Sequence, residues 1–177
     1  MLTSHRIHFS RSATTLLLAT LAILLVSCEA PSAQVDTAVT PEASAPTTDA
    51  PEYFSLRPEL EKAFGYTHAV RVGNHIRVSG AVSMDDNGTP TGMGDVGAQL
   101  RNCYTDLQRI LAHYDCTFAD VIVENIYTTD MDAFLQQAAY RADIYGEQYP
   151  TGTWLEVSGL AAPEFLIEIE IEAYKAD

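Results

Sequence analysis

The sequence has few basic residues. It contains 10 Lys and Arg against 24 Asp and Glu in 177 residues, which gives a formal net charge of −14 at pH 7. The basic residues are scattered singly, whereas a protein that binds nucleic acid neutralises phosphates with clustered Lys and Arg. We therefore expect no nucleic-acid partner, and we interpret the acidity as a solubilising surface.

The sequence also lacks an apolar run long enough to span a membrane. Its longest such run covers residues 13–26, whereas a membrane-spanning helix needs about 20 residues. Arg6 and Arg11 precede the run, a combination typical of a signal peptide. The run ends in Leu-Val-Ser-Cys at residues 25–28, which resembles the lipobox of bacterial lipoproteins.

This pattern predicts a lipoprotein signal peptide over residues 1–27, with Cys28 as the point of lipid attachment. The protein would then be exported and would face the periplasm or the cell exterior from a membrane. The alternative is a signal-anchor helix with an incidental cysteine, which fits the short apolar run less well.

Cysteine is scarce elsewhere, with only Cys103 and Cys116 after Cys28. If Cys103 lies inside a helix that ends near Tyr114, about ten helical residues already separate the two thiols by about 15 Å, beyond disulfide reach. We therefore interpret Cys103 and Cys116 as small buried apolar residues and expect neither a disulfide nor a catalytic thiol.

Composition divides the rest of the chain into two parts. Residues 28–52 are rich in Pro, Ala, Thr and Ser, a composition that buries too little apolar surface to fold, and we predict a disordered tether. Residues 53–177 form a single predicted domain, large enough for one core but not for two.

The domain begins with a predicted hairpin. Two alternating runs, residues 66–72 and 75–79, flank Gly73-Asn74, which suits a tight turn. If Val72 pairs with His75, one face of the hairpin carries polar and aromatic side chains and the opposite face becomes the better core candidate. The members of the first face are Tyr66, His68, Val70, Arg77 and Ser79.

Apolar spacing predicts two helices and three further strands. A helix with one buried stripe follows Asp95 and ends near Tyr114, and a second runs from Asp130 to about Tyr145, with Asp95 and Asp130 as N-caps. We expect the inner side of the second helix to carry Phe134, Leu135, Ala138, Ala142 and Tyr145. The strands cover residues 121–128, 153–157 and 166–174.

The resulting order, ββαβαββ, predicts an α+β sandwich of two layers, with both helices on one face of a mixed sheet. The last strand alternates Ile167, Ile169 and Ile171 with Glu168, Glu170 and Glu172. One face of the sheet would therefore pack on the helices, and the other would carry three carboxylates about 7 Å apart.

The order of elements and several local phrases resemble the RidA/YjgF family of reactive-intermediate deaminases, also described as L-PSP endoribonuclease-like or chorismate-mutase-like. The phrases are GYTHAVRVGN at residues 65–74, VSG at 78–80, TDMDAF at 129–134, YP at 149–150, LEV at 155–157 and PEFLIEIE at 163–170. The resemblance implies a mixed six-stranded sheet and a homotrimer with a small-molecule cleft at each subunit boundary. It implies no cofactor and no metal.

The resemblance also suggests site residues. Active members hold the carboxylate of a 2-iminoacid with an arginine and position the attacking water with a glutamate. Glu168 matches that glutamate, although Glu170 has the same orientation two residues on. Tyr66 matches the aromatic residue that borders the cleft, and Ser79 with Gly80 matches a segment that lines it.

The arginine position falls on Gly152, which is the main departure from the family pattern, and Trp154 would place a large aromatic ring nearby. A guanidinium fork suits a carboxylate, so its absence predicts weak deamination.

We therefore expect a tethered module that binds a neutral or cationic small molecule, with room at Gly152 for a longer side chain. The alternative is an active deaminase in which Arg77 replaces the missing cation. The acidic surface disfavours ribonuclease and chorismate chemistry.

Overall fold

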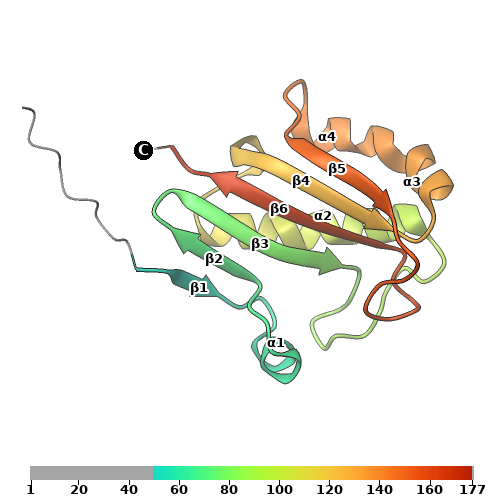
Figure 1. Ribbon diagram of the computed structural model, residues 1–177, viewed down its shortest axis with the longest axis horizontal. Coiled ribbons are helices and arrows are strands. Elements are labelled where there is room, and N and C mark those ends of the chain that lie inside the picture. Colours follow the sequence, from blue (N-terminus) through green and yellow to red (C-terminus); the bar gives the residue numbers. More distant parts are fainter. Residues whose placement is uncertain (1–49, 177) are drawn as a thin grey trace, which may run out of the picture. The chain divides into compact units, whose positions relative to one another are not determined.

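The structure, a computed structural model, describes residues 50–176 and shows a six-stranded sheet with its main helices on one face (Figure 1). The predicted signal peptide, Cys28 and the tether up to residue 49 lie outside the described residues. The strands follow the order β1-β2-β3-β6-β4-β5 across the sheet. They are β1 Glu52–Phe54, β2 Ala69–Val72, β3 His75–Val82, β4 Val121–Thr128, β5 Thr151–Glu156 and β6 Ile167–Tyr174.

The sheet is mixed, as predicted. Only β4 and β5 pair in parallel, whereas every other neighbouring pair is antiparallel. The predicted hairpin is confirmed in its register, since Val72 lies opposite His75. The turn uses Gly73 with φ +57, a left-handed conformation that glycine adopts without a steric penalty.

The first predicted helix is α2, Val96–His113, which crosses the covered face of the sheet (Figure 1). The side chain of its N-cap, Asp95, accepts a hydrogen bond from the backbone N–H of Ala98 at 2.9 Å. Its apolar stripe meets the isoleucines of β6, and Leu100, Leu107, Ile167 and Ile169 are all fully buried. These side chains form the core of the domain.

The second predicted helix is divided. Helix α3, Met131–Gln137, continues through a 3-10 turn, Ala138–Tyr140, into α4, Arg141–Tyr145. Asp130 caps α3 as expected, and Phe134 is fully buried. The expected inner positions Leu135 and Ala142 are exposed instead. Each residue turns a helix by about 100°, so Leu135 points to a different side of α3 from the buried Phe134.

Two elements precede the predicted hairpin. Strand β1 begins at Glu52 and pairs with β2 at the edge of the sheet. Helix α1, Pro58–Phe64, has proline at its first turn and ends at Gly65, whose φ of +71 is left-handed. Both signals are visible in the sequence. None of the helices in residues 50–176 is both long enough and apolar enough to cross a membrane.

The presence of α1 corrects the expected position of His68. That side chain is 3% exposed and faces α1, where its Nδ1 lies 3.2 Å from the Glu61 carboxylate. Glu61 also accepts the backbone N–H groups of Arg57 and His68, at 2.6 and 3.1 Å. His68 therefore belongs to a buried polar contact that fixes α1 and does not lie on the open face of the hairpin.

Candidate functional site

A pocket of about 530 Å³ opens where β3 and β6 meet α1 and two loops. Its floor comes from β3 and β6, and its walls come from α1, the loop after β3 and the loop before β6. The lining residues are Leu60, Phe64, Tyr66, Ser79, Gly80, Val82, Met84, Gly88, Pro90, Ala161, Ala162, Phe165 and Glu168. The structure thus brings together four of the predicted site residues, Tyr66, Ser79, Gly80 and Glu168.

Gly80 is the reason that Glu168 can occupy the floor. A Cβ atom at Gly80 would overlap the carboxylate of Glu168 and would lie 2.6 Å from its Cδ. The register between β3 and β6 shifts between Val78 and Ala81, and such a bulge redirects side chains next to a site. The Glu168 side chain therefore lies across the backbone of β3 at the one position without a side chain.

The three carboxylates of β6 have different partners. Glu172 lies 3.0 Å from His75 Nε2 and 3.5 Å from an Arg77 nitrogen. Glu170 accepts hydrogen bonds from Asn125 at 2.9 Å and Tyr127 at 3.1 Å.

Within residues 50–176, no hydrogen bond or ion pair reaches the carboxylate of Glu168. Burial raises the pKa of Glu168, and the nearby charge of Glu170 raises it further. Glu168 is therefore the carboxylate of the row that remains available to a ligand.

The pocket is otherwise apolar. Among its described lining residues, Glu168 is the only one that carries a charge, and three are aromatic: Phe64, Tyr66 and Phe165. The Arg57 guanidinium lies behind the pocket wall, where it contacts the Asp106 carboxylate at 2.7 Å and donates to two backbone carbonyls. Its charge is compensated inside the protein.

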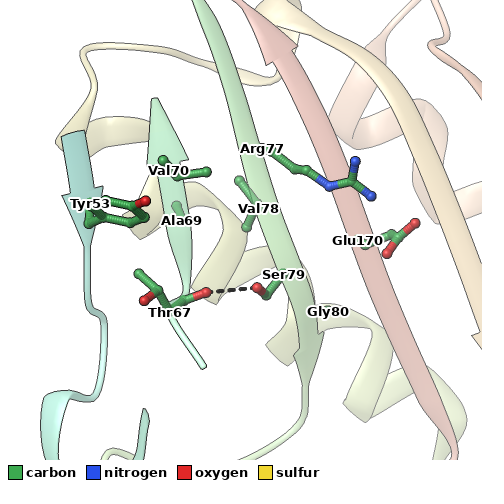
Figure 2. A pocket seen from close by; sticks show the side chains of 9 residues that line it. All are labelled: Tyr53, Thr67, Ala69, Val70, Arg77, Val78, Ser79, Gly80 and Glu170. Atoms are coloured by element: carbon green, nitrogen blue, oxygen red, sulfur yellow. Dashed lines mark hydrogen bonds between the residues drawn. The ribbon is translucent and has the colours of Figure 1, made fainter. Parts of the chain in front are cut away.

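A smaller pocket of about 320 Å³ adjoins the first on the open face of the sheet (Figure 2). The two share Ser79 and Gly80, and the Ser79 hydroxyl donates to the carbonyl of Thr67 at 2.8 Å. Figure 2 shows Arg77 reaching from β3 towards β6. Arg77 pairs in register with Glu172, four residues from Glu168, so their backbones are separated by about 13 Å along the strand.

Gly152 and Trp154 lie elsewhere in the subunit. They pair in register with Glu124 and Ile126, which are buried on the helix side of the sheet. The Trp154 ring meets Phe134 edge-on, with centroids 5.0 Å apart. The structure therefore does not bring Gly152 or Trp154 together with Glu168 in one subunit. The register places Leu155, and not Trp154, on the same face of the sheet as Glu168. Leu155 and Glu168 both lie opposite Tyr127.

The expectation that Gly152 leaves room for a longer side chain is wrong. A Cβ atom at Gly152 would overlap the backbone carbonyl oxygen of Glu124 and would lie 2.8 Å from its carbonyl carbon. Backbone atoms cannot rotate out of the way as a flexible side chain can. Glycine at this position is thus required by the close approach of β4 and β5.

Sequence analysis missed a buried cluster beside Gly152. Glu124 is 1% exposed, and its carboxylate accepts hydrogen bonds from Tyr104 and Tyr145, both at 2.7 Å. Arg141 contacts the same carboxylate at 2.6 Å, and its guanidinium carbon lies 5.2 Å from the centroid of the Trp154 ring. A cation is therefore present near Gly152, but Glu124 neutralises it.

Neither of the two cysteines in the described part of the chain presents an exposed thiol. Cys103 and Cys116 are both buried and free, and burial raises the pKa of each thiol. Within residues 50–176, no three His, Cys, Asp or Glu side chains are grouped so that they could hold a metal ion. The pocket around Glu168 is thus the principal candidate site.

Comparisons with known proteins agree with the fold and with the sequence phrases. The family model for Endoribonuclease L-PSP matches residues 57–175. A RutC family protein of Pyrococcus horikoshii is 32% identical over 110 residues, which cover 62% of this chain and 86% of the relative. The 3-aminoacrylate deaminase RutC of Acinetobacter baylyi is 28% identical over 109 residues, which cover 62% of this chain and 86% of that enzyme.

A solved structure extends the agreement to the fold. A YjgF-family protein of Mycobacterium tuberculosis superimposes with a TM-score of 0.62 and 32% identity, over 71% of this chain and the whole of that protein. The predicted α+β fold with its mixed six-stranded sheet is confirmed. Because the family model covers more than half of the sequence, the chain belongs to the Endoribonuclease L-PSP family, to which the names RidA and YjgF also refer.

Proposed function

We propose that this chain is a trimeric, membrane-tethered protein that binds a small molecule and has little 2-iminoacid deaminase activity. The observation that carries the proposal is the unpaired carboxylate of Glu168 in a pocket with no basic lining residue. A pocket of about 530 Å³ has the size and apolar character of small-molecule sites in proteins.

Charge explains why a 2-iminoacid is a poor ligand here. Its carboxylate would meet the carboxylate of Glu168 with no guanidinium to offset the repulsion, which weakens binding. Arg141 is neutralised by Glu124, and Arg77 lies about 13 Å along the strand from Glu168. Within one subunit, neither arginine replaces the cation that the family pattern has at position 152.

An oxidase-coupled assay tests this proposal. Amino-acid oxidase generates 2-iminoacids in situ, and the measured quantity is the acceleration of 2-ketoacid formation when the protein is added. We expect an acceleration of less than about twofold over the oxidase alone. Robust turnover that is lost in Glu168→Ala or Arg77→Ala would contradict the proposal.

The second candidate is an active deaminase that hydrolyses imines or enamines. It is favoured by the free carboxylate of Glu168, which can orient a water molecule, and by the relative named as a 3-aminoacrylate deaminase. In this candidate the Arg77 of a neighbouring subunit supplies the missing cation. The Arg77→Ala arm of the same assay distinguishes the two candidates.

The proposed trimer rests on the open face of the sheet and on the family to which the chain belongs. Exposed apolar side chains accompany the glutamate row on that face, including Tyr53 and Val72, which are 67% and 49% exposed. Exposed apolar side chains are typical of surfaces that become buried when subunits associate. The pocket around Glu168 would then adjoin a subunit boundary.

The proposed tether rests on the sequence alone. The short apolar run, the Leu-Val-Ser-Cys segment at residues 25–28 and the polar stretch after it occur together at the N-terminus. They support export of the protein and lipid attachment at Cys28.

A further inference from the structure

We propose that the natural ligand is an organic monocation, an ammonium or iminium group on an apolar body that carries no carboxylate. This inference rests on the proposed function, since it concerns the same pocket. It differs from the 2-iminoacids handled by active relatives because the ligand here contributes the positive charge and the protein contributes the negative one.

Glu168 differs from the other two carboxylates of β6 because it has no partner in the described residues. Glu170 and Glu172, its neighbours on the same face of β6, are satisfied by partners within the chain. Glu168 is held over Gly80 in a partly buried position without such a partner. A partly desolvated carboxylate without a partner is unfavourable unless a cation forms an ion pair with it.

The wall around that carboxylate is apolar and partly aromatic. Leu60, Val82, Met84 and Pro90 contribute apolar surface, which would cover the body of the ligand and exclude water from the ion pair. Phe64 and Tyr66 add aromatic rings. Aromatic faces attract ammonium groups through cation–π interactions, which strengthen as the cation loses its water.

The same pocket disfavours ligands that carry a carboxylate. An amino acid could place its ammonium group near Glu168, but its carboxylate would then meet a wall that, within one subunit, is apolar and has no basic residue. The pocket therefore selects amines over the amino acids from which they derive. An unpaired charge in an apolar site is a strong means of rejecting the wrong ligand.

Titration calorimetry of the full chain at pH 7.5 tests the inference with four probes that share one apolar body. They are 2-phenylethylamine, 2-phenylethanol, 3-phenylpropanoate and phenylalanine. We expect the amine to bind at least tenfold more tightly than each of the other three. Glu168→Gln should weaken the amine at least tenfold and leave the alcohol within twofold, which also shows that the variant is folded.

Glu172→Gln is the matched control, because it removes one charge from the same face of β6 outside the pocket lining. It should change amine affinity by less than about twofold. If 2-phenylethanol or 3-phenylpropanoate binds as tightly as the amine, this inference is overturned while the proposed binding function stands. If none of the four probes binds, the binding function itself fails.

The affinity should also depend on pH. The groups that face Glu168 are Glu170 on β6, Tyr127 on β4 and Tyr66 after α1. The pKa of each tyrosine is raised, mainly by burial, so neither tyrosine gains a charge at neutral or acidic pH. Amine binding should weaken as the pH falls through the raised pKa of Glu168, and binding that does not change down to pH 4 would contradict the pairing.

Discussion

Gly152 lies so close to the backbone of β4 that there is no space for a side chain at this position. Because a Cβ atom there would overlap the carbonyl of Glu124, Gly152→Ala should displace β5 and lower the free energy of unfolding by about 1–3 kcal/mol. Chemical denaturation measures the loss. Gly159→Ala is the matched control, since a Cβ atom at Gly159 meets nothing within 4 Å. Equal stabilities of the two variants would contradict the close approach of β4 and β5.

The same contact changes the expected outcome of a rescue experiment. Gly152→Arg would introduce the arginine that the family resemblance led us to expect at this position, but the new residue must first move the backbone of β5. We therefore expect no gain of 2-iminoacid hydrolysis in the oxidase-coupled assay, even when Trp154→Cys is added. A gain of tenfold or more would show that β5 adapts readily.

The ionised carboxylate of Glu168 should destabilise the folded protein at neutral pH, because its pKa is raised by folding. An acid whose pKa is raised by folding favours the folded state at pH values below its unfolded pKa, and this contribution disappears as the pH rises through the folded pKa. Glu168→Gln should therefore raise the Tm at pH 7.5 and have a smaller effect near pH 4. Thermal melts at the two pH values check the sign, and a variant that melts below the wild type at pH 7.5 would contradict it.

At the residue scale, sequence reasoning succeeded where a pattern was strong. The Ile and Glu alternation of residues 167–172 predicted the face of Glu168, and the family resemblance pointed to Ser79 and Gly80, which line the same pocket. The face of Trp154 could not be predicted, because residues 151–156 form an edge strand that is exposed throughout and has no apolar alternation. Its orientation depends on parallel pairing with β4, which no local pattern encodes.

At the scale of elements, helix α1 determines the shape of the candidate site. It contributes Leu60 and Phe64 to one wall, and its buried Glu61 fixes it to the domain. Burial opposes ionisation of Glu61, but hydrogen bonds from Arg57 and His68 outweigh it and lower the pKa. The resulting stability is present above the unfolded pKa and is lost as the pH falls through the folded pKa.

Glu61→Gln should therefore destabilise the protein by about 1–3 kcal/mol at pH 7, because it replaces a buried acceptor of several hydrogen bonds with an amide. Glu59→Gln removes an exposed acid from the same helix and should change stability by less than about 0.5 kcal/mol. Urea denaturation of both variants provides the comparison. Equal effects would show that α1 is not fixed through Glu61.

The elements that sequence analysis missed had weak signals for a physical reason. Helix α1 has seven residues, less than two full turns, so its apolar spacing repeats too few times to stand out beside Pro58 and Gly65. The division of residues 131–145 into α3 and α4 involves neither glycine nor proline. No local sequence signal therefore marks the point at which the two helices divide.

At the scale of the whole molecule, assembly is the first prediction. Multi-angle light scattering of the chain without residues 1–27 should give three times the monomer mass at micromolar concentration, because the open sheet face carries exposed apolar side chains. Tyr53→Glu would add charge to that face and should shift the distribution towards monomer. A stable monomer of the unaltered chain would contradict the trimer.

Membrane attachment is the second prediction at this scale. Labelled fatty acid should be incorporated at Cys28, and the protein should fractionate with membranes. Cys28→Ser should abolish the label, whereas Ser32→Ala in the predicted tether should retain it. A wild-type protein that never acquires the label would refute lipid anchoring without affecting the pocket.

The contact of Trp154 with Phe134 and Arg141 has a practical consequence. Trp154 is the only tryptophan of the chain, and its ring lies on the helix side of β5, outside the lining of the pocket around Glu168. Intrinsic fluorescence excited at the indole band therefore reports on a single site. A red shift of its emission would record the separation of β5 from the helices, so the protein carries a built-in optical probe of its own unfolding.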